Sequence, residues 1–295
     1  EDEIIHKPVM INEVLSFIPE NSNIVIDATL GEGGHTKAML DLNLEVHGFE
    51  RDKNILDVAK KRLSNYKKFH YYNNTYDKMT ESLPENIIGN VDFMLYDLGV
   101  SMFHFKKAER GFSFNEDNKL DMRLGINEKN AYQVINEYGK KDLERIFKDY
   151  GEIKNPSKLA DAIIKEREKK NIETAKELEN IIFHNSDKSK KYGRINPATL
   201  IFQAVRIEVN DELNILKKSI ENIKNILKKY GVIVIISYHS LEDRIVKRFF
   251  KENEKTKNKD GIFRLLNSKV LTPTIEEIKL NPASRSAKMR AAQLL

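Results

Sequence analysis

The 295-residue chain contains no cysteine, and this absence excludes several kinds of chemistry. Disulfide bonds, thiolate metal sites and thiol nucleophiles are all ruled out. The chain also lacks an apolar run long enough to cross a membrane, and its first ten residues, EDEIIHKPVM, do not have the pattern of a secretory signal. We therefore expect a soluble cytoplasmic protein that makes no contact with a membrane.

Positive charge is concentrated near the end of the chain. The overall formal charge is +5, but residues 243–295 carry 13 Lys and Arg against 6 Asp and Glu, whereas residues 1–126 carry 15 against 21. An acidic front half with a basic tail is typical of an enzyme that binds a polyanion, with the tail supplying phosphate contacts. A general richness in Lys, Asn and Ile accounts for the same numbers without nucleic acid, so charge leaves both interpretations open.

Apolar stretches alternate with helix-like stretches over the first hundred residues. Residues 35–40 and 54–66 have the helical pattern, and the runs around them are rich in β-branched and aromatic residues. The expected strands are 23–28, 44–50, 69–74, 91–97 and, much later, 231–240. This alternation predicts βαβ units and therefore an α/β fold with a parallel sheet covered on both faces.

The 134 positions between Asp97 and Gly231 are far more than one crossover helix needs. Residues 127–185 hold short amphipathic stretches bounded by Gly, Pro or Asn, which predicts a small helical domain set into the sheet domain. A further helical region, 198–229, returns the chain to the sheet. The domains expected from this spacing are a discontinuous sheet domain of residues 1–105 and 201–295, and an inserted domain of residues 106–200.

The first strand runs directly into a glycine-rich turn, IVIDATLGEGGHT (24–36). Glycines let a backbone come close to a ligand, but the dinucleotide fingerprint needs a third glycine where this chain has Thr36. Glu50, 17 residues past Gly33, is placed to accept the hydroxyls of an adenosine ribose. S-adenosylmethionine has no pyrophosphate to seat on the helix, so the turn favours this methyl donor over NAD. The plainer interpretation of Glu50 is an exposed acid at a strand end.

Asp97 ends the fourth expected strand, in YDLGVS (96–101). The exocyclic amine of a nucleobase is a poor nucleophile because its lone pair is conjugated with the ring. A carboxylate that accepts a hydrogen bond from that amine favours the pyramidal geometry in which the nitrogen attacks. Methylation at C5 of a pyrimidine uses a cysteine nucleophile, which this chain lacks. Asp97 is therefore our candidate catalytic residue for direct methyl transfer to an amine.

Two later stretches supply candidate substrate contacts. ERGFSFNEDNKLDMR (109–123) interleaves aromatic and charged residues, which can stack an unpaired base and hold its phosphate, although packing beneath the insert is the plainer interpretation. SYHSLEDRIVKRFF (237–250) places His239 near a serine and an acid, but no G-x-S-x-G elbow and no second metal ligand accompany it. The candidate substrate-binding residues are Arg110, Phe112, Phe114, Asp121, Arg123 and His239, and we expect no metal.

Eight runs, in order along nearly the whole chain, resemble the MraW (RsmH) family, whose members methylate N4 of a cytidine in the decoding region of small-subunit ribosomal RNA. They are HKPVMINEVL, DATLGEGGHT, DLGVS, ERGFSF, LDMR, FQAVRIEVNDEL, ISYHSLEDRIVKRFF and NPASRSAKMRAA. The resemblance implies a Rossmann-like S-adenosylmethionine methyltransferase sheet with an inserted helical domain for substrate recognition. It also implies that SAKMRAAQLL, which is helical by propensity, forms the closing antiparallel strand.

The resemblance further implies which residues bind the methyl donor. These are Gly33, Gly34, His35, Glu50, Tyr76, Asp97 and His104. Tyr76 would place an aromatic face near the adenosine or the cationic sulfonium. His104 stands in SMFH, where the family typically reads Ser-Ser-Pro-Gln, so an imidazole would replace an amide contact. Leu200 stands where we expect Arg in relatives.

The residues and the resemblance together predict N4-methylation of a cytidine in 16S ribosomal RNA within the small ribosomal subunit, with S-adenosylmethionine as donor. Two alternatives stay open: a methyltransferase for another amine, such as adenine N6 or DNA cytosine, and a non-catalytic RNA-binding assembly protein on a methyltransferase scaffold. The DLGV turn lacks the Pro-Pro of the first class, and the intact glycines, Glu50 and Asp97 argue against the second. Whether the chain forms a homodimer is left open.

Overall fold

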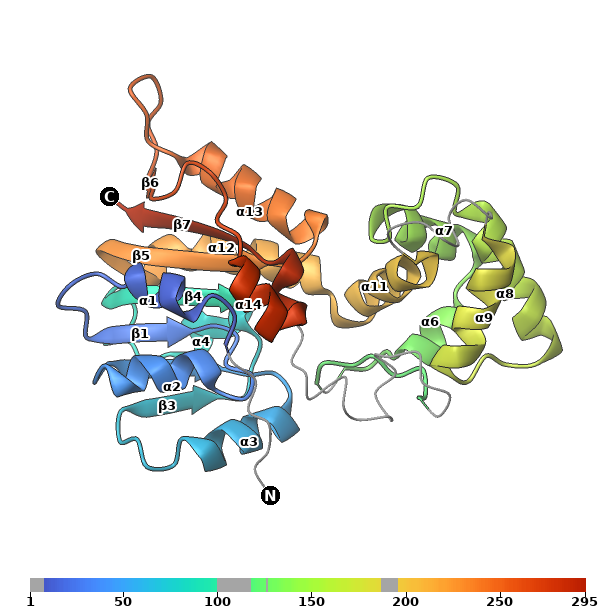
Figure 1. Cartoon of the computed structure of the whole chain (residues 1–295), viewed down its shortest axis with the longest axis horizontal. Coiled ribbons are helices and arrows are strands. Elements are labelled where there is room, and N and C mark those ends of the chain that lie inside the picture. The colour runs from blue at the N-terminus through green and yellow to red at the C-terminus, as the bar shows by residue number, and fades with distance from the viewer. Residues whose placement is uncertain (1–7, 100–117, 126, 187–195) are drawn as a thin grey trace. The chain divides into compact units, whose positions relative to one another are not determined.

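The computed structural model describes residues 8–99, 118–125, 127–186 and 196–295. The chain divides into two compact units, Glu1–Val100 with Leu213–Leu295, and Ser101–Glu212. We call the first the sheet unit and the second the helical unit, after the elements that each contains (Figure 1). The candidate residues that lie outside the described residues are His104, Arg110, Phe112 and Phe114.

The sheet unit contains seven described strands in the order β3-β2-β1-β4-β5-β7-β6. Their bounds are β1 Ile24–Asp27, β2 Glu45–Phe49, β3 Phe69–Tyr72, β4 Val91–Asp97, β5 Leu227–Ser237, β6 Phe263–Leu265 and β7 Lys288–Leu294. Strands β1 to β5 pair in parallel, and β7 is antiparallel to both β5 and β6. The α/β prediction is confirmed, and so is the closing antiparallel strand.

Strand β5 begins earlier than its sequence pattern predicted. We expected it to start at Gly231, but Leu227 already pairs with Val91, and a register shift follows between Val91 and Phe93. Residues 228–230 are exposed and interrupt the apolar run. A search for apolar runs therefore did not detect the first residues of the strand.

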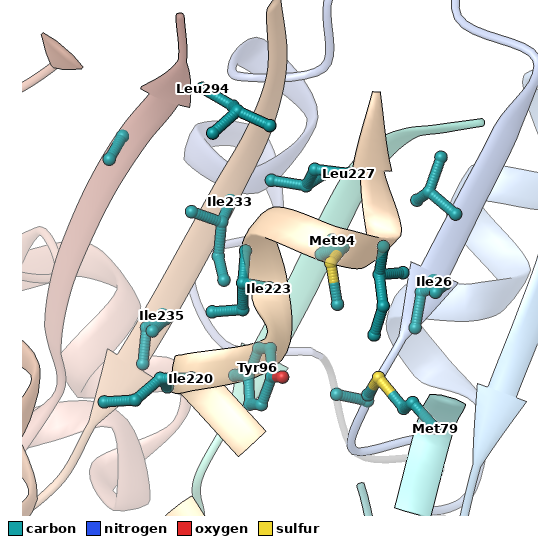
Figure 2. Close-up of a cluster of buried hydrophobic side chains, with 14 of the residues drawn as sticks. Ile26, Met79, Met94, Tyr96, Ile220, Ile223, Leu227, Ile233, Ile235 and Leu294 are labelled. Atoms are coloured by element: carbon teal, nitrogen blue, oxygen red, sulfur yellow. The ribbon is translucent and has the colours of Figure 1, made fainter. Parts of the chain in front are cut away.

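Helices cover both faces of the sheet because the strand side chains alternate between them. Val25, Phe93 and Val234 pack with α1 (Ile11–Ser16), α2 (Gly34–Asp41) and α3 (Lys53–Arg62). The other face packs with α4 (Met79–Ser82), α12 (Glu212–Ile226) and α13 (Ser240–Asn253), and Figure 2 shows Ile220 and Ile223 of α12 over Met94, Ile233 and Ile235. The short helix α14 (Ile275–Leu280) precedes β7. This three-layer arrangement leaves the carboxyl edge of the strands to carry polar residues.

The helical unit has its own apolar core. Its described helices are α6 Ala131–Glu137, α7 Lys140–Asp149, α8 Ser157–Lys169, α9 Ala175–Asn185 and α11 Pro197–Asn210. Side chains at the starts of α6 and α9 form capping boxes, Asn130 with Gln133 and Thr174 with Glu177. None of the described helices is long and apolar enough to cross a membrane.

The unit boundary differs from the one expected at residue 200. That position falls inside α11, and Ile201, Phe202 and Val205 of this helix are buried in the core of the helical unit. Because an amphipathic helix follows the core that buries its apolar face, the whole of α11 belongs to the helical unit, which extends to Glu212.

Candidate active site

Three acidic side chains stand at or just past the carboxyl ends of adjacent parallel strands. Asp27 ends β1, Glu50 directly follows β2 and Asp97 ends β4. Since β2, β1 and β4 are neighbours in the sheet, these ends meet at one edge, where open α/β sheets bind their ligands. The turn after β1 is held to both neighbours, because the Ala28 amide donates to the Leu95 carbonyl (2.8 Å) and the Leu30 amide to that of Phe49 (2.9 Å).

Glu50 is held by backbone amides rather than by a cation. Its Oε2 accepts a hydrogen bond from the Gly31 amide (3.1 Å), and its Oε1 accepts one from the Asp52 amide (2.8 Å). Burial outweighs these two hydrogen bonds and raises the pKa of Glu50 to about 7. Each carboxylate oxygen keeps a further lone pair, so Glu50 can accept two more hydrogen bonds from a ligand.

The glycines of the turn have two different reasons for being glycine. A Cβ on Gly33 would lie 2.8 Å from Leu63 Cδ1, and one on Gly34 would lie 3.3 Å from Pro8 Cγ, so both positions are filled by the protein's own packing. Gly33 also has a φ of +83°, which favours glycine. At Gly31 the nearest atom to such a Cβ is a backbone oxygen 3.9 Å away. Gly31 also has a positive φ (+54°), and it is the glycine of this turn with room for a ligand.

Thr36, which replaces the third glycine of the dinucleotide fingerprint, has a structural partner. Its hydroxyl donates to Asp27 Oδ2 (2.7 Å), and the other oxygen of Asp27 accepts from the Thr29 amide (3.2 Å). Asp27 is 1% exposed, and burial raises the pKa of its carboxyl. The pair ties the first turn of α2 to the end of β1, so Thr36 stabilises the glycine turn that it interrupts.

Asp97 is oriented by three neighbours. The hydroxyl of Tyr238, which directly follows β5, donates to Asp97 Oδ1 (2.7 Å), and the Asp97 amide donates to Thr29 Oγ1 (2.7 Å). Asp97 Oδ2 lies 3.8 Å from His35 Nδ1. Burial and the nearby Asp97 carboxylate raise the pKa of Tyr238 well above its usual value, so its hydroxyl stays protonated and donates. Oδ2 is thus the Asp97 oxygen left for a ligand.

Close packing keeps Tyr238 against Asp97. A Cβ on Gly99 would lie 2.9 Å from the Tyr238 ring, so only glycine permits this approach two residues past Asp97. The buried Glu242 fixes the backbone on the other side by accepting from the Tyr238 amide (2.9 Å). His35 is also anchored, since its Nε2 lies 2.8 Å from the Val9 carbonyl oxygen and donates to it.

Tyr76 joins the same edge through the 3₁₀ turn Tyr76–Lys78 that follows β3. Its ring meets that of Tyr96 edge-on, with centroids 5.3 Å apart and planes at 70°. The Ser219 hydroxyl contacts the Tyr96 hydroxyl (2.6 Å) and donates to the Tyr76 carbonyl (3.0 Å). Because Tyr96 directly precedes Asp97, this packing brings Tyr76 to the end of β4.

The described site thus assembles five of the expected donor-binding positions other than Asp97 around one sheet edge: Gly33, Gly34, His35, Glu50 and Tyr76. The model of the MraW methylase family matches residues 3–295 of the chain. The chain belongs to the MraW methylase family. The resemblance drawn from the sequence is confirmed.

Curated relatives of this MraW methylase match over nearly their whole length. The chain is 74% identical to "Ribosomal RNA small subunit methyltransferase H" of Brachyspira hyodysenteriae, covering 99% of this chain and 98% of the relative. Proteins of the same name from Sulfurihydrogenibium sp. and Borrelia turicatae are 42% and 41% identical. Those two matches cover 98% and 99% of this chain, and 98% of each relative.

His239 of this methylase caps the start of helix α13. Its Nδ1 accepts from the Glu242 amide (3.4 Å) and so caps the start of α13, while its Nε2 lies 3.0 Å from Glu242 Oε1. The second contact lacks hydrogen-bond geometry, which leaves Nε2 as a buried polar atom without a hydrogen-bond partner. A substrate contact at His239 stays a prediction.

Asp121 and Arg123, in the helical unit, hold one another. Arg123 donates through Nε to Asp121 Oδ1 (2.8 Å) and through Nη2 to Oδ2 (2.9 Å), a bidentate pair. The neighbouring backbone is tied to α11, because the Leu124 amide donates to Asn210 Oδ1 (2.7 Å). The pair thus has a partner within its own unit, and its contact with substrate stays a prediction.

Tyr238 is the site residue that sequence reasoning missed. It lies beside His239 in the SYHS segment, and the titratable histidine drew attention instead. The available signal was positional: Tyr238 follows a strand expected to lie parallel to β4, so its side chain belonged to the same edge as Asp97.

One group in the described residues has the donor atoms of a metal site: Glu45, His47 and His70. His47 Nε2 lies 3.0 Å from Glu45 Oε1, and His70 Nε2 lies 3.4 Å from the same oxygen. A metal bound by both rings must lie near both ring planes, but these rings stack with centroids 4.6 Å apart and planes only 18° apart. The planes do not meet near the rings, so the group is a polar cluster at the start of β2 rather than a metal centre.

Proposed function

We propose that this MraW methylase uses S-adenosylmethionine to methylate N4 of a cytidine in the decoding region of 16S ribosomal RNA, in the cytoplasm, with the small ribosomal subunit as substrate. Family membership and the names of the relatives support methylation of small-subunit ribosomal RNA. The absence of cysteine favours an amine over C5 of the pyrimidine. The observation that carries the proposal is Asp97, oriented by Tyr238 at the edge that also carries Gly31 and Glu50.

The residues at this edge fit the methyl donor. The open side of Gly31 leaves room for the donor beside the turn, and Glu50 has lone pairs for both ribose hydroxyls. We assign further donor contacts to Gly33, Gly34, His35, Tyr76 and His104. Bound here, S-adenosylmethionine supplies an electrophilic methyl group on a cationic sulfur.

Asp97 prepares the cytosine amine for attack. Because Tyr238 occupies Oδ1, Oδ2 accepts a hydrogen bond from the amine and favours its pyramidal form. With the donor held beside Gly31 and Glu50, its methyl group would pass from sulfur to this nitrogen, and the proton that the amine gives up would pass to solvent. In this mechanism the protein positions and polarises the substrate, and forms no covalent bond with it. The helical unit recognises the RNA substrate.

The decisive experiment is methyl transfer from labelled S-adenosylmethionine to small-subunit particles from cells that lack this gene. Digestion to nucleosides and mass spectrometry then identify the modified base. We expect label in N4-methylcytidine from a single site. Label in another nucleoside would keep the methyltransferase and overturn the base assignment, whereas donor binding without any transfer would favour a non-catalytic RNA-binding role.

A further inference from the structure

Helix α13 presents a continuous basic face to solvent. Arg244, Lys247, Arg248 and Lys251 are all exposed, and their spacing of three and four residues places them on one side of the helix. We call these four residues the basic stripe. Within the described part of the chain, no ion pair joins Lys247, Arg248 or Lys251 to a carboxylate, so these charges are available to a partner.

Two of the three acidic residues of the same helix point inward and are already engaged, whereas the third, Glu252, is exposed. Asp243 is 9% exposed and accepts hydrogen bonds from Arg290 Nε (2.8 Å) and Nη2 (3.2 Å). The packing of α13 on β7 brings these two residues together. Glu242 is 4% exposed and accepts from the Tyr238 amide. The helix therefore turns Glu242 and Asp243 toward the sheet and presents its four cations to solvent.

A hollow adjoins the stripe at the end of the helix. It has a volume of about 570 Å³ and is lined by the four stripe residues together with Lys259, Thr256 and two glutamates. Lys259 is held in place because its ammonium donates to the Lys251 carbonyl (2.9 Å), and the Lys255 amide donates to the Phe263 carbonyl (2.8 Å). The loop thus adds a fifth cation to the surface at a fixed position.

We infer that the basic stripe binds the phosphate backbone of the RNA substrate next to the methylated nucleotide, an inference that rests on the proposed function. The eight residues from Arg244 to Lys251 span about 10 Å of helix, which accommodates two or three successive phosphates. The stripe begins six residues past Tyr238, whose hydroxyl holds Asp97, and α13 then runs from β5 toward β6 (Figure 1). Phosphates bound along α13 would lead the RNA strand away from the reacting base.

The test reverses two charges of the stripe in the full chain, as the double variant Lys247→Glu/Arg248→Glu. Both side chains are exposed, so the fold and donor binding are retained. We expect the KM for small-subunit RNA to rise at least tenfold with kcat at saturating RNA nearly unchanged. A plot of log kcat/KM against log salt concentration should lose about 1.4 from its slope, because two phosphate contacts disappear.

The matched control is Lys217→Glu/Lys218→Glu on α12. These lysines are also exposed in the sheet unit, and the double variant makes the same change in net charge. We expect the control to change the RNA KM less than threefold. An equal effect of the two double variants would show a general charge effect and would overturn the role of the stripe in RNA binding. The absence of an effect in both variants would overturn it as well.

Direct RNA binding separates this inference from the proposed function. Filter binding of a small-subunit RNA fragment is measured for the wild type and both double variants, with calorimetry of S-adenosylmethionine binding alongside. Weaker RNA binding by the stripe variant alone supports the stripe, whether or not methyl transfer is seen. Wild-type protein that methylates RNA while the stripe variant binds it normally would overturn the stripe alone, and wild-type protein that neither binds nor methylates RNA would overturn both.

Discussion

The acids at the sheet edge and the Asp121–Arg123 pair of the helical unit use their carboxylates in opposite ways. Glu50 accepts from two backbone amides, and Asp97 accepts from a tyrosine hydroxyl, with no Lys or Arg ion pair to either within the described residues. Asp121, by contrast, gives both oxygens to the guanidinium of Arg123. All these residues were selected from the sequence as functional candidates.

The difference shows how a carboxylate is kept available for a ligand. A bidentate cation consumes the lone pairs and the charge of its acid, which stabilises the local fold and leaves little for a substrate. Amide and hydroxyl donors orient an acid without neutralising it, at an energetic cost that is visible in the raised pKa of Glu50. The sheet edge therefore has the properties of a ligand site, and the helical pair has those of a structural contact.

The largest effect should come from removing the Asp97 carboxylate. In Asp97→Ala we expect kcat for RNA methylation to fall by roughly 10²–10⁴-fold, because no acceptor orients the amine. Asp97→Asn keeps one acceptor oxygen and should lose less. Single-turnover assays at saturating donor measure both variants, and an alanine variant with wild-type turnover would remove Asp97 from the mechanism.

Replacing Glu50 should act on donor binding rather than on chemistry. Glu50→Gln loses charge-assisted hydrogen bonds to the ribose, so we expect the Kd for S-adenosylmethionine to rise roughly 10–100-fold. Calorimetry measures the Kd, and kcat at saturating donor should stay within a few-fold of the wild type. A large loss of kcat with unchanged Kd would contradict the role assigned to Glu50.

Donor affinity should depend on pH through Glu50. With a pKa of about 7, Glu50 is mostly protonated below neutrality, and a protonated oxygen donates instead of accepting. The Kd for S-adenosylmethionine should therefore rise as pH falls from 8 to 6, approaching tenfold per pH unit at the acid end. Calorimetry across this range should show the slope in the wild type and a flat profile in Glu50→Gln. A flat wild-type profile would exclude this titration.

Tyr238 should have a smaller effect, since it acts through Asp97. Tyr238→Phe removes one hydrogen bond to Oδ1 and keeps the ring that packs against Gly99. We expect kcat to fall about two- to tenfold and the donor Kd to stay unchanged. Steady-state kinetics and calorimetry measure the two quantities, and an unchanged kcat would show that Thr29 and the backbone suffice to orient Asp97.

The smallest effect should come from the ion pair of the helical unit. Arg123 is 37% exposed, so Arg123→Ala should lower the free energy of unfolding by about 1 kcal/mol or less. Urea unfolding followed by circular dichroism measures this change. The KM for RNA should stay within threefold, and a tenfold rise in KM with unchanged stability would instead place Arg123 in the substrate site.

The strands and their edge were predictable because periodicity and strand-end residues are local signals. Patterns of β-branched and aromatic residues located β1 to β4 within a few residues, and Glu50 and Asp97 stood where parallel strands end. The start of β5 was missed because residues 228–230, which follow Leu227, are exposed and interrupt the apolar run. The boundary at Glu212 was missed because the burial of α11 depends on the helices it contacts, not on its own pattern.

The sequence by itself determined the α/β class, the absence of thiol chemistry, and which acids reach the carboxyl edge. Only the tertiary structure decided which of those acids remain available, because a hydrogen-bond partner such as Tyr238 is 141 residues from Asp97 along the chain. It also separated Gly31, which faces open space, from Gly33 and Gly34, which accommodate Leu63 and Pro8. Local pattern specifies the elements, whereas the free lone pairs and open volumes of a site arise from contacts between distant residues.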